Sequence, residues 1–225
     1  MYDNLSVVVP ALDRNQYYSN GDLVAFGDTT LLEWKISQVL GFARKENVYV
    51  STPSDKIIDL AKNKSDMLAS IPAIQPVSNK DLSRMASGYG SRIHPIYKTR
   101  KLHTGMDFSA KSGTPIYATG DGKISKVKKS RIGYGNHVII DHGYGYKTLY
   151  AHMTKYIVHK GQKVKRGEVI GYVGSTGTSV APHLHYEVHK DGRKINPVNF
   201  YYNDLNPDEY EKMLEISSQN NQSFD

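Results

Sequence analysis

The chain of 225 residues is long enough to bury a substantial hydrophobic core, and its length predicts one domain of ordinary size with a smaller part beside it. It contains no cysteine, which excludes a disulfide framework and every zinc site built on thiolates. Any metal ion must therefore be held by His, Asp or Glu. The 17 tyrosines and a hydrophobic content of 39% favour a β-rich globular protein.

The formal net charge of +7 is unevenly distributed along the chain. Residues 79–203 contain 21 basic and 7 acidic residues, whereas residues 1–78 contain 7 and 9, and residues 204–225 contain 1 and 6. A basic block of this kind indicates an anionic polymer as partner. Nucleic acid and the acidic bacterial cell wall both qualify, and a merely soluble basic surface explains the charge equally well.

The sequence shows neither an apolar run long enough to cross a bilayer nor an N-terminal leader with a basic head and a long apolar stretch. The longest apolar run near the start covers only residues 7–12. For a protein that works outside the cytoplasm, we expect a leader or a membrane anchor outside this sequence.

The first part of the chain predicts a helical arm over residues 1–78. Residues 1–27 have no sustained periodicity, but from Asp28 apolar residues recur at three- and four-residue steps and predict an amphipathic helix to about Glu46. Thr30 and Glu33 fit a capping box at its start.

A short extended piece at residues 48–50 separates this helix from a second one. Pro53 suits the first turn of the second helix, which continues to Ile71. Two helices with a short connection predict an antiparallel hairpin. We interpret the arm as a packing scaffold, with a regulatory or dimerising arm as the alternative.

Residues 72–80 form a linker by composition, and beyond them short segments punctuated by Gly and Asp predict antiparallel strands. The fold class is therefore α+β, with an antiparallel sheet or barrel-like sandwich in residues 79–203. A short C-terminal helix over Tyr210–Ile216 and a polar tail make up residues 204–225. The predicted strands cover residues 115–118, 122–128, 137–142, 147–152, 169–174 and 183–189.

Two pairs of side chains in the β region predict a metal site. Because alternate residues of a strand share a face, His183 and His185 emerge on the same side, and two imidazoles so placed suit a transition metal. His103 and Asp107 also have an even spacing, and Gly105 between them leaves room for an ion.

Catalytic zinc keeps three protein ligands and an open position for water. His103, Asp107, His183 and His185, with His152 and Asp141 as further candidates, are too many for one ion. Some of them must act as acid and base, and sequence spacing does not divide them.

Residues 84–199 resemble the lysostaphin-type (LytM-like) zinc metalloendopeptidases. So many motifs in one order over more than a hundred residues are not expected by chance. The matching motifs are Gly88-Tyr-Gly90-Ser-Arg92-Ile-His94-Pro95, His103-x-x-x-Asp107-Phe108, Gly113-Thr-Pro115, Asp121-Gly122, Gly135-Asn136-x-Val138, Tyr150-Ala151-His152, and Gly171–Gly177 followed by His183-Leu-His185.

This resemblance implies a LytM-like catalytic domain over residues 79–203, with His103, Asp107 and His185 as zinc ligands. It implies that His152 and His183 are the catalytic histidines that do not bind zinc, and it leaves open which of them is the general base. The implied function is a zinc-dependent endopeptidase that hydrolyses peptide cross-links of bacterial peptidoglycan by metal-activated water.

The implied partners are peptidoglycan stem peptides or cross-bridges rather than nucleic acid, and the implied location is the cell envelope, periplasmic or extracellular. The alternative is a non-catalytic LytM-like regulator that activates a cell-wall amidase. Such relatives have lost the metal residues, which are all present here. A third hypothesis, nucleic-acid binding, predicts salt-sensitive DNA binding that survives chelation. The cleaved bond and the oligomeric state are not readable from the sequence.

Overall fold

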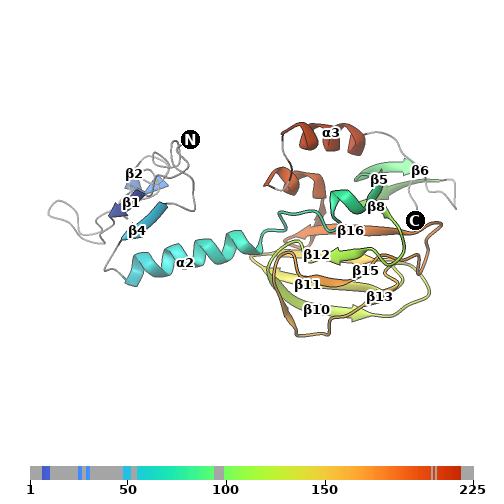
Figure 1. Ribbon diagram of the computed structural model, residues 1–225, viewed down its shortest axis with the longest axis horizontal. Coiled ribbons are helices and arrows are strands. Elements are labelled where there is room, and N and C mark those ends of the chain that lie inside the picture. Colours follow the sequence, from blue (N-terminus) through green and yellow to red (C-terminus); the bar gives the residue numbers. More distant parts are fainter. Residues whose placement is uncertain are drawn as a thin grey trace. The chain divides into compact units, whose positions relative to one another are not determined.

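The computed structural model describes residues 7–10, 25–26, 29–30, 48–51, 55–93, 99–203, 205 and 207–218 (Figure 1). The chain divides into two compact units, residues 1–66 and residues 67–225. The boundaries predicted at 78/79 and 203/204 stay predictions.

The first unit contains short strands that the sequence pattern did not predict. Strand β1 (Val7–Pro10) pairs in parallel with β4 (Val48–Ser51), and β2 (Ala25–Phe26) pairs with β3 (Thr29–Thr30) in antiparallel fashion. The lack of a sustained period in residues 1–27 gave no indication of β1 and β2, because β1 pairs with the distant β4 and β2 has only two residues. The extended piece at 48–50 is confirmed as part of β4.

The second predicted helix is confirmed as α2 (Asp55–Ser70). It ends just before Pro72, as expected, since the residue before a proline is disfavoured in the helical conformation. The helix predicted up to Glu46, and with it the helical hairpin, lies outside the described residues.

Residues 72–77, expected to be a linker, are packed instead. Val77 is completely buried in the hydrophobic core, and the carbonyl of Pro76 accepts a hydrogen bond of 2.9 Å from the backbone N–H of Tyr117. The segment is rich in Pro but also apolar, so burial of its side chains outweighs its loop-like composition.

The second unit is built on an antiparallel sheet whose strand order is β14-β10-β11-β12-β16-β8-β5, with β17 pairing with β16. A smaller sheet has the order β13-β15-β9, and β6 pairs with β7 in a separate hairpin. The α+β class with an antiparallel sheet is thereby confirmed. The strands are β5 (Leu82–Ser87), β6 (Gly90–Ile93), β7 (Arg100–His103), β8 (Met106–Ala110), β9 (Pro115–Tyr117), β10 (Gly122–Lys128), β11 (His137–Gly143), β12 (Tyr146–Ala151), β13 (Lys155–Tyr156), β14 (Lys163–Val164), β15 (Val169–Tyr172), β16 (His183–Lys190) and β17 (Arg193–Ile195).

Strand β16 lies inside the large sheet, between β12 and β8, and separates two environments. Leu184, Tyr186 and Val188 alternate with its polar residues and belong to the hydrophobic core. The polar side chains of His183, His185 and Glu187 therefore share the opposite face, and they too are buried. One strand thus contributes to the core and to the polar site at once.

The core around β16 is aromatic and internally hydrogen bonded. Tyr186 packs edge-on against Phe108, with ring centroids 6.3 Å apart, and lies 5.3 Å from Tyr150. The hydroxyl of Thr119 lies 2.9 Å from the hydroxyls of both Tyr150 and Tyr186, so these buried phenols keep hydrogen-bond partners.

The C-terminal helix is confirmed as α3 (Pro207–Ser218), with Asp208 and Glu209 in its first turn, where the helix dipole favours acidic residues. Met213 of α3 belongs to the hydrophobic core. Two 3-10 helices complete the second unit: η3 (Asn79–Asp81) lies before β5, and η4 (Pro197–Asn203) lies before α3. Within the described part of the chain, no helix is long and apolar enough to cross a membrane.

We expect Leu184→Ala to lower the free energy of unfolding by about 2–5 kcal/mol, because the deleted atoms are fully buried and leave a cavity. Urea denaturation monitored by tyrosine fluorescence measures the change. Ile132→Ala, at a side chain that is 80% exposed, is the control and should stay within about 0.5 kcal/mol of the parent. Equal losses in both variants would contradict the assigned core.

Candidate active site

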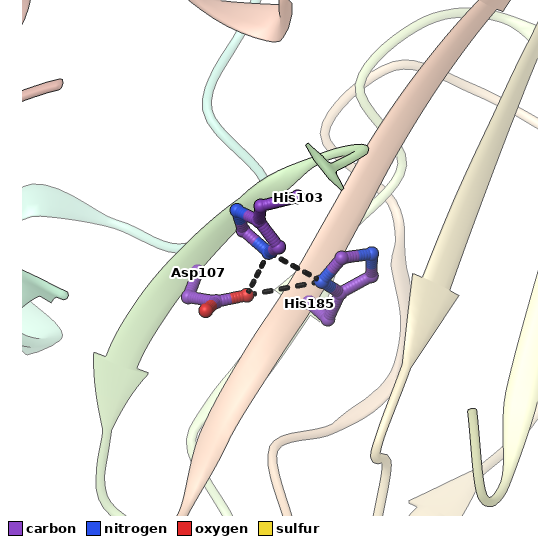
Figure 2. Close-up of side chains that lie close together, drawn as sticks. All are labelled: His103, Asp107 and His185. Carbon is purple, nitrogen blue, oxygen red and sulfur yellow. Dashed lines mark hydrogen bonds and ion pairs between the residues drawn. The ribbon is translucent and has the colours of Figure 1, made fainter. Parts of the chain in front are cut away.

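Three elements bring the predicted metal-ligating residues together. His103 ends β7, Asp107 lies in β8, and His185 lies in β16 directly opposite Asp107 in the register of the two strands. Figure 2 shows the three side chains turned toward one another from these separate segments.

The three side chains form a nearly equilateral triangle of donor atoms. His103 Nε2 lies 3.1 Å from Asp107 Oδ1 and 3.1 Å from His185 Nδ1, and the third side, from His185 Nδ1 to Asp107 Oδ1, measures 3.0 Å. The residues are buried, with exposed fractions of 7% for His103, 0% for Asp107 and 2% for His185.

Neighbouring acceptors determine which nitrogen of each imidazole carries the proton. His103 Nδ1 lies 2.7 Å from the carbonyl oxygen of Gly88, and His185 Nε2 lies 3.1 Å from a carboxylate oxygen of Glu187. Both partners are oxygens that accept, so these two nitrogens donate. In the neutral rings His103 Nε2 and His185 Nδ1 are then lone-pair donors, and both face the Asp107 carboxylate.

Three lone-pair donors that converge in a buried space repel one another unless a cation lies between them. Burial acts to raise the pKa of Asp107, but the positive charge of His103 and His185 when both rings are protonated, and the hydrogen bonds they then donate, hold it well below its usual range. Tetrahedral zinc with bonds of about 2.0–2.1 Å would separate its ligand atoms by about 3.3–3.4 Å. The triangle is close to that size, so its donor set and geometry fit a small divalent cation.

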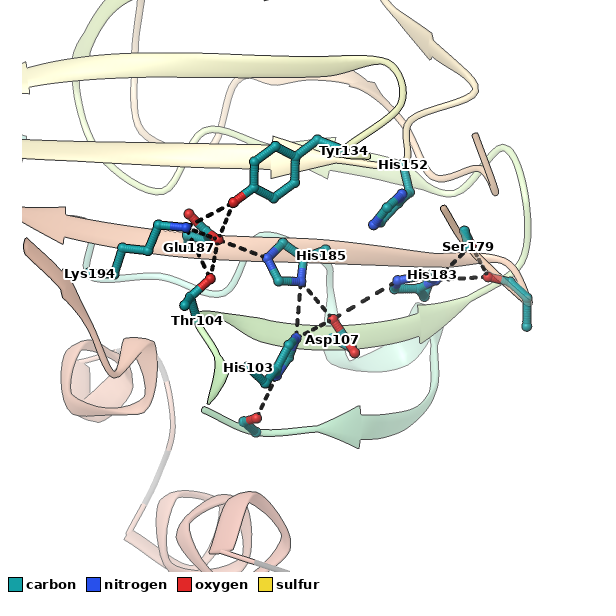
Figure 3. Close-up of polar contacts among 12 residues, drawn as sticks. His103, Thr104, Asp107, Tyr134, His152, Ser179, His183, His185, Glu187 and Lys194 are labelled. Carbon is teal, nitrogen blue, oxygen red and sulfur yellow. Dashed lines mark hydrogen bonds and ion pairs between the residues drawn. The ribbon is translucent and has the colours of Figure 1, made fainter. Parts of the chain in front are cut away.

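Two further imidazoles lie beside the triangle. His183 Nε2 is 4.0 Å from Asp107 Oδ1, and the His152 ring lies 4.7 Å from His183 and 6.0 Å from His185 between centroids. In Figure 3 both rings lie on the Asp107 side of His185. The structure therefore brings all five residues predicted for the site into one cluster.

Both of these histidines are oriented through their Nδ1 atoms. His152 Nδ1 donates to the carbonyl of Thr176 at 2.7 Å, and His183 Nδ1 donates to that of Ala181 at 2.8 Å. In each neutral ring Nε2 is then the basic atom. His152 also has a φ of 57°, a left-handed conformation that is uncommon outside glycine and tends to occur at functional sites.

One further candidate, Asp141, lies outside the cluster. Asp141 pairs with Lys147 at 3.3 Å and accepts from the backbone N–H of Gly143, so its carboxylate is engaged at a turn rather than in the cluster. Gly105 also lies close to β16, where a Cβ would meet the backbone carbonyl of Tyr186, and its role in leaving room for an ion stays a prediction.

Sequence reasoning missed a second group of residues on the other side of His185, of which Figure 3 shows Glu187, Thr104, Tyr134 and Lys194. Its centre is Glu187, which is completely buried and accepts hydrogen bonds from five side chains. Burial acts to raise the pKa of Glu187, but hydrogen bonds from His185 and His189 hold it far below its usual range. The signal that could have found Glu187 is the alternation of side chains along β16, which places it on the same face as His185, two residues earlier. The donors are Thr104, Tyr134, His185, His189 and Lys194.

Comparison with known proteins shows what the region around this cluster is similar to. Residues 101–197 match Peptidase family M23. The DD-carboxypeptidase/endopeptidase Mpg of Neisseria meningitidis is 50% identical over 117 residues, which cover 52% of this chain and 27% of that protein. The peptidoglycan DD-endopeptidase ShyA of Vibrio cholerae is 43% identical over 122 residues, 54% of this chain and 28% of that protein.

A solved structure agrees with these matches. The crystal structure of a zinc containing peptidase from Vibrio cholerae is 41% identical, with a TM-score of 0.50, and the match covers 54% of this chain and 37% of that one. The chain spans about a quarter of the length of the two relatives above. Residues 101–197, which include His103, Asp107, His152, His183 and His185, thus form a region similar to peptidase family M23.

Proposed function

We propose that this chain is a zinc-dependent endopeptidase that hydrolyses peptide cross-links of bacterial peptidoglycan. The observation that carries the proposal is the buried triangle of lone-pair donors on His103, Asp107 and His185, with two more oriented imidazoles beside it. The names of the two relatives, both endopeptidases, support the reaction class, and that of ShyA supports the substrate.

The residues that would hold the zinc ion are His103 through Nε2, Asp107 through Oδ1 and His185 through Nδ1. Without cysteine in the chain, two imidazoles and one carboxylate are a donor set typical of catalytic rather than structural zinc. Zinc in such a site supplies a Lewis acid that lowers the pKa of water and polarises a carbonyl group.

His152 and His183 would carry the proton transfers. Each presents Nε2 as its basic atom because Nδ1 is held by a backbone carbonyl. One of them takes a proton from the attacking water and passes it to the leaving amine, which is general acid–base catalysis. The other, once protonated, donates a hydrogen bond to the oxygen that becomes negative, and Asp107 at 4.0 Å from His183 Nε2 stabilises positive charge on that ring.

A basic groove next to these histidines favours an anionic substrate. A groove of about 610 Å³ is lined in part by Lys129, Arg131 and Thr176, and the Thr176 carbonyl is the one that orients His152. An acidic wall polymer complements such a surface. The substrate in turn implies a location in the cell envelope.

Digestion of purified peptidoglycan with and without a chelator tests the function. We expect the full chain to release peptide fragments, the chelator to stop release, and added Zn²⁺ to restore it. Mass spectrometry of the fragments identifies the bond that is cut. Release that continues unchanged in chelator would contradict the proposal, and stimulation of a wall amidase without cleavage would favour the regulator alternative.

We expect His185→Ala to abolish stoichiometric zinc binding, because it removes one of three donors from the triangle. Metal content after dialysis against a weak chelator, measured by atomic emission, checks the assignment. His159→Ala is the matched control, since His159 is exposed and, among the described residues, forms hydrogen bonds within its own turn. A His185→Ala protein that keeps one zinc ion per chain would remove His185 from the ligand set.

We expect His152→Ala to keep its zinc but to lose at least about 100-fold in turnover, the size of effect typical of a general acid or base. The two readouts are metal content and initial rate on a soluble cross-linked peptide. Turnover equal to that of the parent, with zinc retained, would exclude His152 from the proton transfers.

A further inference from the structure

We infer that Glu187 is a positioning residue that fixes the ring orientation and the protonated nitrogen of His185, so that His185 Nδ1 faces the metal site. The inference rests on the proposed zinc site. Glu187 follows His185 by two residues in β16, and therefore shares its face of the sheet. Its Oε1 accepts a hydrogen bond of 3.1 Å from His185 Nε2, on the side of the ring away from the triangle.

Glu187 is held in place far more firmly than one histidine contact requires. Its Oε1 also accepts from Thr104 Oγ1 at 2.6 Å, from Tyr134 OH at 2.8 Å and from Lys194 Nζ at 3.0 Å. Its Oε2 accepts from His189 Nε2 at 2.7 Å. These donors come from the β7–β8 turn, the loop before β11, strand β17 and β16 itself, so the carboxylate is fixed from several directions.

The hydrogen-bond partners of Glu187 decide what His185 can do. Lys194 Nζ can only donate, so Oε1, which lies 3.0 Å from it, is a hydrogen-bond acceptor. His185 must then place its proton on Nε2, which leaves Nδ1 with a lone pair directed at His103 and Asp107. An anionic acceptor behind a ligating imidazole also raises the basicity of that ligand.

The same group connects the two histidines of the triangle. Thr104 immediately follows His103, and its hydroxyl donates a hydrogen bond to Glu187, the carboxylate that also accepts from His185. A Cβ on Gly105 would collide with the backbone carbonyl of Tyr186 and would press against the Glu187 side chain and the His185 ring. A shift of Glu187 would therefore move both imidazoles relative to Asp107.

The rival explanation is that Glu187 and Lys194 form a structural ion pair with no influence on the metal. Lys194 is the one lysine among the donors, and its side chain is 36% exposed, so its removal leaves the contact between His185 and Glu187 in place. A structural pair predicts equal consequences when either partner is neutralised. A positioning role predicts that only the loss of the carboxylate changes His185.

The experiment compares the Zn²⁺ affinity of four forms of the full chain by competition with a chromophoric chelator at fixed pH. We expect Glu187→Gln, which keeps the size of the side chain, to bind Zn²⁺ about 10–100-fold more weakly than the parent. Lys194→Met should lose less Zn²⁺ affinity than Glu187→Gln does. Glu168→Gln, at a glutamate whose described partner is the backbone N–H of Lys165, should bind as the parent does.

Histidine NMR on the unmodified chain provides a readout that does not depend on any variant folding. Long-range ¹H–¹⁵N spectra should show His185 protonated at Nε2 in the metal-free protein, and a mixture of tautomers in Glu187→Gln. A parent chain with the proton on Nδ1, or a Glu187→Gln variant with unchanged Zn²⁺ affinity, would overturn the inference. A parent chain that binds no Zn²⁺ would instead refute the proposed function on which it rests.

Discussion

The convergence of three lone pairs on one buried point is the constraint on which the rest of this structure depends. His103 Nε2, Asp107 Oδ1 and His185 Nδ1 lie 3.0–3.1 Å apart in a space that solvent barely reaches. Such an arrangement is unfavourable without a cation, and it persists only when the surrounding structure holds each ring. The backbone carbonyl of Gly88 holds the His103 ring, and the carboxylate of Glu187 holds the His185 ring. Each accepts a hydrogen bond from the nitrogen that points away from the triangle, so the proton of each neutral ring lies outside it.

The large sheet supplies the rigidity that this constraint demands. Strand β16 buries Leu184, Tyr186 and Val188 in an aromatic core, so the opposite face of the same strand cannot shift without disturbing the packing. Its pairing with β8 sets His185 opposite Asp107. The stability of the core and the geometry of the site are thus properties of one strand, and sites on strands are held more precisely than sites on loops.

The two histidines outside the triangle are held differently, by backbone carbonyls of loops. The carbonyl of Thr176 accepts a hydrogen bond from His152 Nδ1, and the hydroxyl of Thr176 accepts one of 2.9 Å from the backbone N–H of Asn136. Gly135 packs against Thr176 in a left-handed conformation that leaves no room for a Cβ. Loop glycines therefore bring His152 close to the triangle, whereas strand pairing positions Asp107, His183 and His185.

The sequence by itself determined the α+β class and helices α2 and α3, and it named the five residues that the structure brings together, because period-2 alternation and ordered motifs are local patterns that survive folding. It did not determine β1 or the burial of residues 72–77, since each depends on a partner distant in the chain. Nor did it show β2, which has only two residues, or the contacts that keep Asp141 at its own turn. Only the tertiary structure decided that Glu187 stands behind His185 with donors from residues 104, 134, 189 and 194. The physical reason is that a buried carboxylate is stable only with hydrogen-bond donors around it. Four segments of the chain must fold together before Glu187 has these donors.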